Sequence, residues 1–330
     1  MPQEPIPHWP GELVALGETT LHVRSTPAGP EERAVFVHGL AGSATNWTDV
    51  MGELSGEVRG YALDLPGAGF SPAPPGADYS VDAYASAVTA LVEHVGGPVH
   101  LVGNSLGGAV AVRVAATHPQ LVRTLTLISP ALPDLLPRYG PARVAVSATP
   151  RIGEWAASRM RWMPPERRIQ ATMAMCYADA GRVHPTRVED AITELRRRDD
   201  LPYAGLALVA SARALVNEYF RRGEDNLWRQ AARVTAPTMV IHGRRDRLVD
   251  PRMAARAGRT FPDVRLVLLP HAGHVAQMEY PLLVARHIRA LMREGARLTE
   301  LSPGAGVSPR GGETEDAPGT KNAENAASVR

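Results

Sequence analysis

The chain has 330 residues, of which 44% are apolar and 21% charged, as expected for a globular protein with a large core. Its 36 basic and 34 acidic side chains leave a net charge of +2, which gives no reason to expect nucleic acid as a partner. The single cysteine, Cys176, excludes an intrachain disulfide and a cysteine-based zinc cluster. The first residues do not resemble a secretory signal, and no apolar run reaches the ~18 residues of a transmembrane segment, so we expect a cytoplasmic protein.

The predicted elements alternate between strands and helices along most of the chain. Residues 12–16 and 19–24 flank a turn at Gly17 and predict an antiparallel hairpin. Further strands are predicted at 57–65, 98–103, 123–129, 238–243 and 264–270, and helices at 81–94, 106–118 and 251–261. Such alternation indicates right-handed βαβ crossovers, a largely parallel sheet and the α/β fold class.

The alternation stops near Pro130 and resumes near Pro237. The intervening segment, 130–236, is predicted to be helical at 151–163, 165–177, 185–197 and 203–220. Residues 299–330 are rich in Gly, Ser, Pro and charge, a composition that predicts a disordered tail.

One short motif predicts a nucleophile. In LVGNSLGGAV, Ser105 stands between Gly103 and Gly107, with a predicted strand before it and a predicted helix after it. A serine on a tight strand-to-helix turn is exposed at the carboxyl edge of a parallel sheet. Glycines on either side allow close backbone approach and unusual dihedral angles.

A serine nucleophile needs a base, and the base needs an acid that orients it. Asp246 follows the predicted strand 238–243, and His274 follows the strand 264–270. Asp250 could be the acid instead, but it precedes Pro251 and is expected to cap the next helix, so we favour Asp246. His271 is the alternative histidine.

The chain resembles the α/β-hydrolase superfamily in an ordered set of motifs over residues 33–294. They are FVHGLAGSATNW, LDLPGAGFS, GNSLGG, and HGRRDRLVDP with AGHVAQMEYP. The resemblance implies a mostly parallel eight-stranded α/β-hydrolase sheet flanked by helices. It divides the chain into a first core part at 1–129, a helical cap at 130–236 and a second core part at 237–298.

The resemblance also implies roles for individual residues. Ser105, Asp246 and His274 form a catalytic triad, and the backbone N–H groups of Leu40 and Leu106 form the oxyanion hole. His38 supports the oxyanion loop through hydrogen bonds. The roles of Asp64 and Glu279 are expected to be structural, and His242 is expected to be a satisfied core histidine.

The cap segment carries bulky apolar side chains and arginines. Most of the apolar ones are expected to pack the cap helices together, with a few facing the cleft: Trp155, Met160, Trp162, Met163, Met173, Met175 and Tyr177. The arginines are expected to form a solvated face: Arg151, Arg159, Arg161, Arg167 and Arg168.

The expected function is hydrolysis of a small to medium apolar carboxylic ester through an acyl-enzyme, with a small-molecule ester as partner and without metal or cofactor. Val275 and Met278 replace the two tryptophans that often flank the histidine in carbon–carbon bond hydrolases of aromatic degradation, which leaves that class as the alternative. A slow-turnover ligand receptor of the same fold is a second alternative. The sequence indicates neither the natural acyl group nor an oligomeric state.

Overall fold

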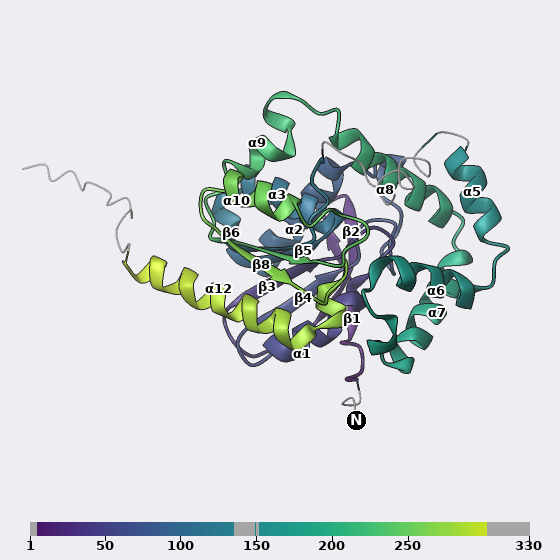
Figure 1. Cartoon of the computed structure of the whole chain (residues 1–330), viewed down its shortest axis with the longest axis horizontal. Coiled ribbons are helices and arrows are strands. Elements are labelled where there is room, and N and C mark those ends of the chain that lie inside the picture. Colours follow the sequence, from purple (N-terminus) through teal and green to yellow (C-terminus); the bar gives the residue numbers. More distant parts are fainter. Residues whose placement is uncertain (1–4, 135–148, 150–151, 302–330) are drawn as a thin grey trace, which may run out of the picture.

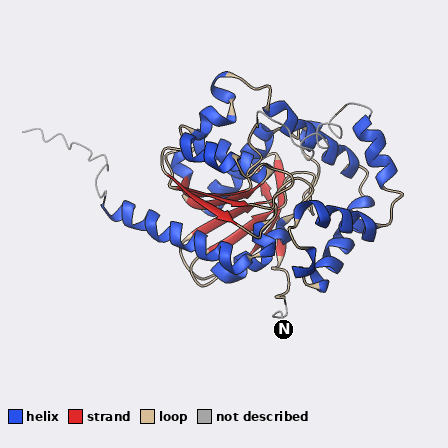
Figure 2. Ribbon diagram, in the orientation of Figure 1, coloured by secondary structure: helices blue, strands red, loops and turns tan. Residues whose placement is uncertain are grey.

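The computed structural model describes residues 5–134, 149 and 152–301. Its centre is an eight-stranded sheet in the order β1-β2-β4-β3-β5-β6-β7-β8 (Figures 1 and 2). The strands are β1 (Gly11–Leu16), β2 (Thr19–Ser25), β3 (Arg33–Val37), β4 (Arg59–Leu63), β5 (Val99–Asn104), β6 (Val122–Ile128), β7 (Thr238–Gly243) and β8 (Val264–Leu269). Strands β3 to β8 pair in parallel, whereas β1 and β2 form an antiparallel hairpin whose second strand also pairs antiparallel with β4. The predicted fold class and hairpin are confirmed.

Helices cover both faces of the sheet (Figure 2). On one face lie α2 (Val81–Val95), α3 (Leu106–Thr117), α9 (Leu227–Ala231) and α10 (Met253–Thr260); on the other lie α1 (Thr48–Leu54), α11 (Ala276–Glu279) and α12 (Pro281–Leu301). Alternate residues of β3 show how the two faces are divided: Val35 and Val37 pack in the first core, and Ala34 and Phe36 in the second. This alternation is the two-residue period of a strand buried on both sides.

Of the described helices between β6 and β7 in the chain, α9 packs on the sheet, and the four before it gather at one side of the sheet (Figure 1). They are α5 (Ile152–Met160), α6 (Pro165–Cys176), α7 (Pro185–Asp199) and α8 (Ala204–Glu218). Their bounds agree with the predicted helices to within a few residues at each end.

The prediction that most apolar residues of this segment pack between its helices is wrong for the first four of them. Trp155, Met160, Trp162 and Met163 are exposed, and Trp162 keeps 87% of its surface accessible. They lie in α5 and the turn after it, at the rim of the molecule (Figure 1). Tyr177, at the end of α6, is buried as expected.

The arginines of this segment differ in their exposure to solvent. Arg159, Arg161 and Arg167 are exposed, as expected, but Arg168 is half-buried and forms an ion pair with Asp199 at 2.5 Å. Arg151 lies outside the described residues.

Several elements were not predicted. They include β3, α1, α9, α11 and α12. Helix α12 extends to Leu301, three residues into the expected tail, and residues 302–330 lie outside the described part of the chain. Within the described residues, no helix combines the length and the apolar character needed to cross a membrane.

Candidate active site

Ser105 stands on a strained turn between β5 and α3. Its backbone has φ 53° and ψ −115°, a left-handed conformation that is costly for a residue with a Cβ atom. The predicted strand–serine–helix arrangement is therefore present, with the serine held in an unusual backbone conformation.

The glycines beside Ser105 are required by close backbone contacts. A Cβ atom on Gly107 would lie 2.6 Å from the carbonyl oxygen of His38 and closer still to that of Val37. A Cβ atom on Gly103 would lie 2.6 Å from the carbonyl carbon of Gly107. Any side chain at either position would push α3 away from the sheet.

Asp246 and His274 meet although they follow different strands. Asp246 lies in the turn after β7, and His274 lies in the loop after β8. The Asp246 Oδ2 atom is 2.9 Å from His274 Nδ1, and both side chains are buried. The other carboxylate oxygen, Oδ1, accepts hydrogen bonds from the backbone N–H groups of Leu248 and Val249 at 2.8 and 3.0 Å. The carboxylate is thus held from both sides and points at the imidazole.

The environment of Asp246 favours its ionised form. Burial alone would raise the pKa of the Asp246 carboxyl group, but the imidazoles of His274 and His242 lower this pKa more, so that it falls well below its ordinary value. His242 is fully buried, and its Nε2 atom lies 3.4 Å from Asp246 Oδ2.

The second imidazole beside Asp246 was not anticipated from the sequence. His242 was expected to be a satisfied core histidine. It is buried, but its Nδ1 atom has no hydrogen-bond partner among the described residues, and its other ring nitrogen contacts the carboxylate that holds His274. The available signal was its position four residues before Asp246 across the end of a strand.

The loop that carries His274 is attached to the serine turn. The side-chain amide of Asn104, the residue before Ser105, donates hydrogen bonds to the carbonyl oxygens of Ile128 at 3.0 Å and of His274 at 3.1 Å. In the described structure, Ser105 Oγ and His274 form no hydrogen bond with each other. Such a bond often tightens only when substrate is bound.

The same loop is attached to the end of α6. The backbone N–H of His274 donates to the carbonyl oxygen of Cys176 at 2.7 Å. Glu279 accepts from the N–H of Gly273 through Oε1 at 2.6 Å and from the N–H of Ala178 through Oε2 at 2.9 Å. Glu279 therefore has the structural role that was expected, and that role joins two distant segments of the chain. The partners from α6 could not be read from the sequence.

The segment that follows β3 runs beside Ser105. A Cβ atom on Gly39 would lie 3.1 Å from Ser105 Cβ. His38 holds this segment in place, because its Nδ1 atom bonds the carbonyl oxygen of Gly39 at 2.7 Å and its Nε2 atom accepts from the N–H of Leu65 at 2.9 Å. Burial lowers the pKa of His38, which agrees with this neutral tautomer. The supporting hydrogen bonds expected of His38 are present.

Leu40 and Leu106 directly follow Gly39 and Ser105, the two residues that lie in contact. Leu106 is the first residue of α3, so its backbone N–H has no partner within the helix. Leu40 follows Gly39 directly, in the segment that lies against Ser105.

The alternative acid and the alternative histidine lie apart from this arrangement. Asp250 pairs with Arg252, with 2.7 Å between Oδ2 and Nη2, and accepts from the N–H of the same residue at 2.9 Å. Its backbone carbonyl also accepts from the N–H of Met253 at 2.8 Å, so Asp250 makes the hydrogen bonds expected of a cap, although α10 itself is bounded at Met253. His271 is exposed.

Asp64 is structural, as expected. It is buried and accepts hydrogen bonds from the N–H groups of Ala44 and Phe70 at 2.7 and 2.8 Å. Its Oδ2 atom also lies 2.7 Å from His22 Nδ1. Burial would raise the pKa of Asp64, but these hydrogen bonds and the nearby imidazoles lower it below its ordinary value.

The comparisons with known proteins identify the family. The chain is 30% identical over 261 residues to the dihydrolipoyllysine-residue acetyltransferase component of the acetoin cleaving system of Pseudomonas putida, an alignment that covers 79% of this chain but only 63% of that relative's length. It is 26% identical over 275 residues to the pimeloyl-[acyl-carrier protein] methyl ester esterase of Nitrosospira multiformis, covering 81% of this chain and 95% of the esterase. Among solved structures, a meta-cleavage product hydrolase from Pseudomonas fluorescens superposes with a TM-score of 0.69 at 18% identity, over 86% of this chain and 98% of that one. Residues 35–281 match the family described as alpha/beta hydrolase fold, and the chain belongs to that family.

Proposed function

We propose that this protein is a serine hydrolase that cleaves small to medium apolar carboxylic esters through an acyl-enzyme. The observation that carries the proposal is the contact of 2.9 Å between Asp246 and His274, in loops attached to the strained turn of Ser105. Three residues from three strand ends are thereby brought to one edge of the sheet, where ligands bind in α/β folds.

Each residue then has a chemical task. His274 removes the proton from Ser105 Oγ as the hydroxyl attacks the ester carbonyl, and later gives that proton to the departing alcohol. Asp246 holds the imidazole by its Nδ1–H and stabilises the imidazolium that forms. Its lowered pKa keeps it ionised for this task. Water then hydrolyses the acyl-enzyme by the same steps in reverse order.

The negative charge that develops on the carbonyl oxygen needs hydrogen-bond donors. In the proposal these donors are the backbone N–H groups of Leu40 and Leu106. The Leu106 N–H supports this role because it stands at the start of α3 and has no partner within that helix. The Leu40 N–H is supported by the contact of Gly39, the residue before it, with Ser105.

The choice of an ester as substrate has two supports. A similar protein is named as a methyl ester esterase and is aligned over almost its whole length. The residues after His274 favour the same choice, since Val275 and Met278 stand where tryptophans often occur in carbon–carbon bond hydrolases. The structural likeness to a meta-cleavage product hydrolase is a likeness of fold and does not select the bond that is cleaved.

A panel of nitrophenyl esters from acetate to palmitate tests the proposal. We expect repeated turnover of the shorter esters and its loss in Ser105→Ala, by several orders of magnitude. Ser86→Ala is the matched control, because Ser86 is exposed on α2 and its hydroxyl donates to the carbonyl oxygen of Asp82 in the same helix. Near-native turnover by folded Ser105→Ala would contradict the mechanism. A single stoichiometric release of nitrophenol would point to a receptor instead of an enzyme.

A further inference from the structure

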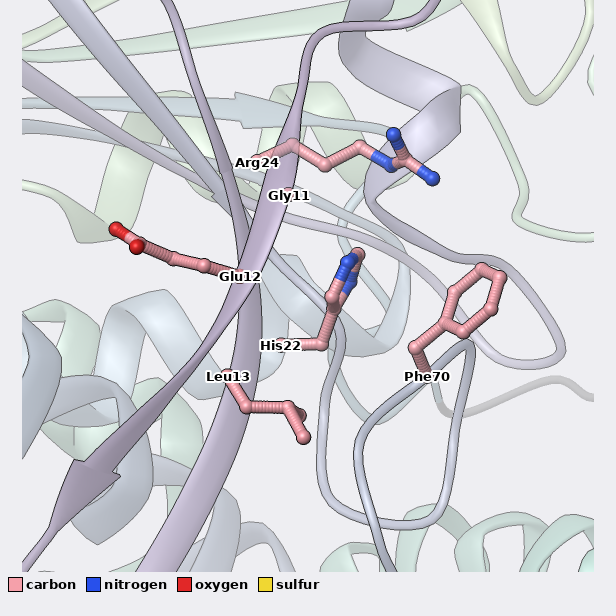
Figure 3. Close-up of a pocket in the computed structure, with 6 residues that line it drawn as sticks. All are labelled: Gly11, Glu12, Leu13, His22, Arg24 and Phe70. Carbon is pink, nitrogen blue, oxygen red and sulfur yellow. The ribbon is translucent and has the colours of Figure 1, made fainter.

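A groove of about 400 Å³ lies at the far edge of the sheet, and the proposed mechanism does not use it. We call it the edge groove; it is lined by Gly11, Glu12, Leu13, His22, Arg24 and Phe70 (Figure 3). Strand β2, which supplies His22 and Arg24, is separated from β5 by β4 and β3. Three strand spacings put the groove ~14 Å from the strand that leads to Ser105.

His22 brings a buried polar group to the edge groove. Only 7% of the residue is exposed, and its Nδ1 atom lies 2.7 Å from Asp64 Oδ2. The described residues provide no hydrogen-bond partner for the other ring nitrogen, Nε2, and this nitrogen is not fully buried. An imidazole that a carboxylate holds from behind is well placed to bind a group at its free nitrogen.

Gly11 makes the room above this nitrogen. A Cβ atom at position 11 would lie 2.6 Å from His22 Cε1 and closer still to Nε2. The backbone of Gly11 is an ordinary strand backbone, so its conformation alone does not require glycine. The missing side chain therefore keeps His22 open to the groove.

Arg24 brings a positive charge to the same side. Figure 3 shows its guanidinium beyond the His22 ring, with the Phe70 ring facing both. One Arg24 nitrogen, Nη1, donates to the carbonyl oxygen of Trp9, whereas the other terminal nitrogen, Nη2, has no partner among the described residues and is not buried. The guanidinium therefore retains hydrogen-bonding capacity.

The remaining walls are apolar. Leu13 is 63% exposed and Phe70 is 47% exposed. The Phe70 ring is held from behind by the Arg197 guanidinium of α7, 3.8 Å from the ring centre. The Glu12 carboxylate points to the opposite side of β1 from His22 and Phe70 (Figure 3).

We propose that the edge groove binds a small carboxylate with an apolar tail. The two carboxylate oxygens match two donors, Arg24 and the His22 ring, and the tail lies on Leu13 and Phe70. A carboxylate at Nε2 places the His22 ring between two carboxylates, its own partner Asp64 and the ligand, which favours the doubly protonated ring. The other charges near the ring are those of Arg24, Arg197 and Glu12. This proposal does not rest on the function proposed above.

Hexanoate is the probe, measured by titration calorimetry on the full chain, with 1-hexanol as the uncharged comparison. We expect saturable binding of hexanoate by the wild type, and binding at least tenfold weaker in Gly11→Ala, where the new Cβ covers His22 Nε2, and in Arg24→Gln. Gly56→Ala is the matched control, because its Cβ would meet nothing within 4 Å, and it should bind like the wild type. In ¹⁵N spectra of the wild type saturated with hexanoate, both His22 ring nitrogens should carry a proton.

Three results would overturn the proposal. They are no saturable binding up to the solubility limit, equal binding of hexanoate by the wild type and Gly11→Ala, and binding of 1-hexanol as tight as that of hexanoate. The last result would show an apolar groove without carboxylate recognition. If Gly11→Ala does not fold, the loss of affinity in Arg24→Gln decides the matter, since that change removes charge and fills no space. Ester turnover by Gly56→Ala and Arg24→Gln should equal that of the wild type, which separates this test from that of Ser105.

Discussion

Ser105 is held in a backbone conformation that few serines adopt, and the surrounding residues explain how. Its φ of 53° is enforced by the close packing of α3 on the sheet, which Gly103 and Gly107 permit. Strain of this kind costs of order 1–3 kcal/mol and persists only where neighbouring structure imposes it. It places the hydroxyl at the end of β5, beside the loop of His274.

The closeness of this packing can be tested at Gly107. In Gly107→Ala the new methyl group would collide with backbone oxygens of residues 37 and 38, which cannot move independently of β3. We expect destabilisation of about 1–3 kcal/mol or more, together with reduced ester turnover because Ser105 shifts. Urea denaturation of Gly107→Ala beside Gly56→Ala measures the effect. Equal midpoints for the two variants would show that the contact is not tight.

The two candidate acids can be separated by matched substitutions. Asp246→Asn removes the charge that orients His274, and the comparable change in a serine protease costs ~10⁴ in rate. Asp250→Asn should have little effect, because Asp250 pairs with Arg252 and not with His274. Turnover of a short-chain nitrophenyl ester, with circular dichroism as the folding control, gives the answer. A severe loss in Asp250→Asn alone would refute the assignment of Asp246.

At the scale of elements, the loop after β8 is supported by a segment distant in sequence. Glu279 accepts hydrogen bonds from Gly273 and Ala178, and the backbone N–H of His274 donates to Cys176. The end of α6 therefore helps to position His274 relative to the sheet. This arrangement explains why a buried carboxylate is kept near the site even though burial raises its pKa, with the backbone hydrogen bonds lowering it in part.

Removing Glu279 should therefore affect catalysis more than substrate binding. Glu279→Ala leaves two buried N–H groups without a partner, at about 1–3 kcal/mol each. We expect a lower kcat with a smaller change in KM, and a lower melting temperature. Glu279→Gln keeps one acceptor and should recover part of both. If kcat is unchanged in Glu279→Ala, the loop does not need this support to position His274.

The elements differ in how well the sequence predicts them. Strand β5, the turn of Ser105 and helix α3 were predicted because their local pattern and their tertiary environment agree. Strand β3 has only five residues and runs directly into a loop motif, and its apolar residues face both sides, so it shows no alternation. The exposure of Trp155 and Trp162 could not be predicted, because apolar spacing indicates a helix but not whether anything covers it.

The candidate site shows the same limit. The order of Ser105, Asp246 and His274 was readable because each follows a strand, and parallel strands end at one edge of a sheet. The contacts of Cys176 and Ala178 with the histidine loop were not readable, since they depend on how α6 lies across a gap of about a hundred residues in the sequence. The capping hydrogen bonds of Asp250 were readable from the proline that follows it, but its ion pair with Arg252 was not.

At the scale of the whole molecule, a buried charged network ties the sheet's helices to the inserted helices. Arg113 of α3 is 3% exposed and contacts Glu218 of α8 at 2.9 Å and Gln230 of α9 at 3.1 Å. It also pairs with Asp82 of α2. We propose that residues 130–236 form the cap of this enzyme, and this network is one of the places where the cap is anchored.

Removing one charge of the network should lower the stability of the protein, and removing the opposite charge as well should restore part of it. Arg113→Met removes the closer cation from buried Glu218 and leaves it only Arg221, whose Nε atom is 3.4 Å away, so we expect a loss of up to about 3–5 kcal/mol in the free energy of unfolding. The double variant Arg113→Met/Glu218→Leu removes both charges and should lose less. Chemical denaturation of the wild type, Arg113→Met, Glu218→Leu and the double variant measures the difference. A double variant as unstable as the sum of its parts would show that the charges are not coupled.

The central claim is that Ser105 is a nucleophile activated by His274, and covalent labelling tests it most directly. The protein is treated with a fluorophosphonate, digested and analysed by mass spectrometry, alone and as Ser105→Ala and His274→Gln. We predict one adduct, on the peptide that contains Ser105, formed in step with the loss of ester turnover. We predict no adduct in Ser105→Ala and much slower labelling in His274→Gln. An adduct on another residue, or full ester turnover after complete labelling of Ser105, would contradict the account.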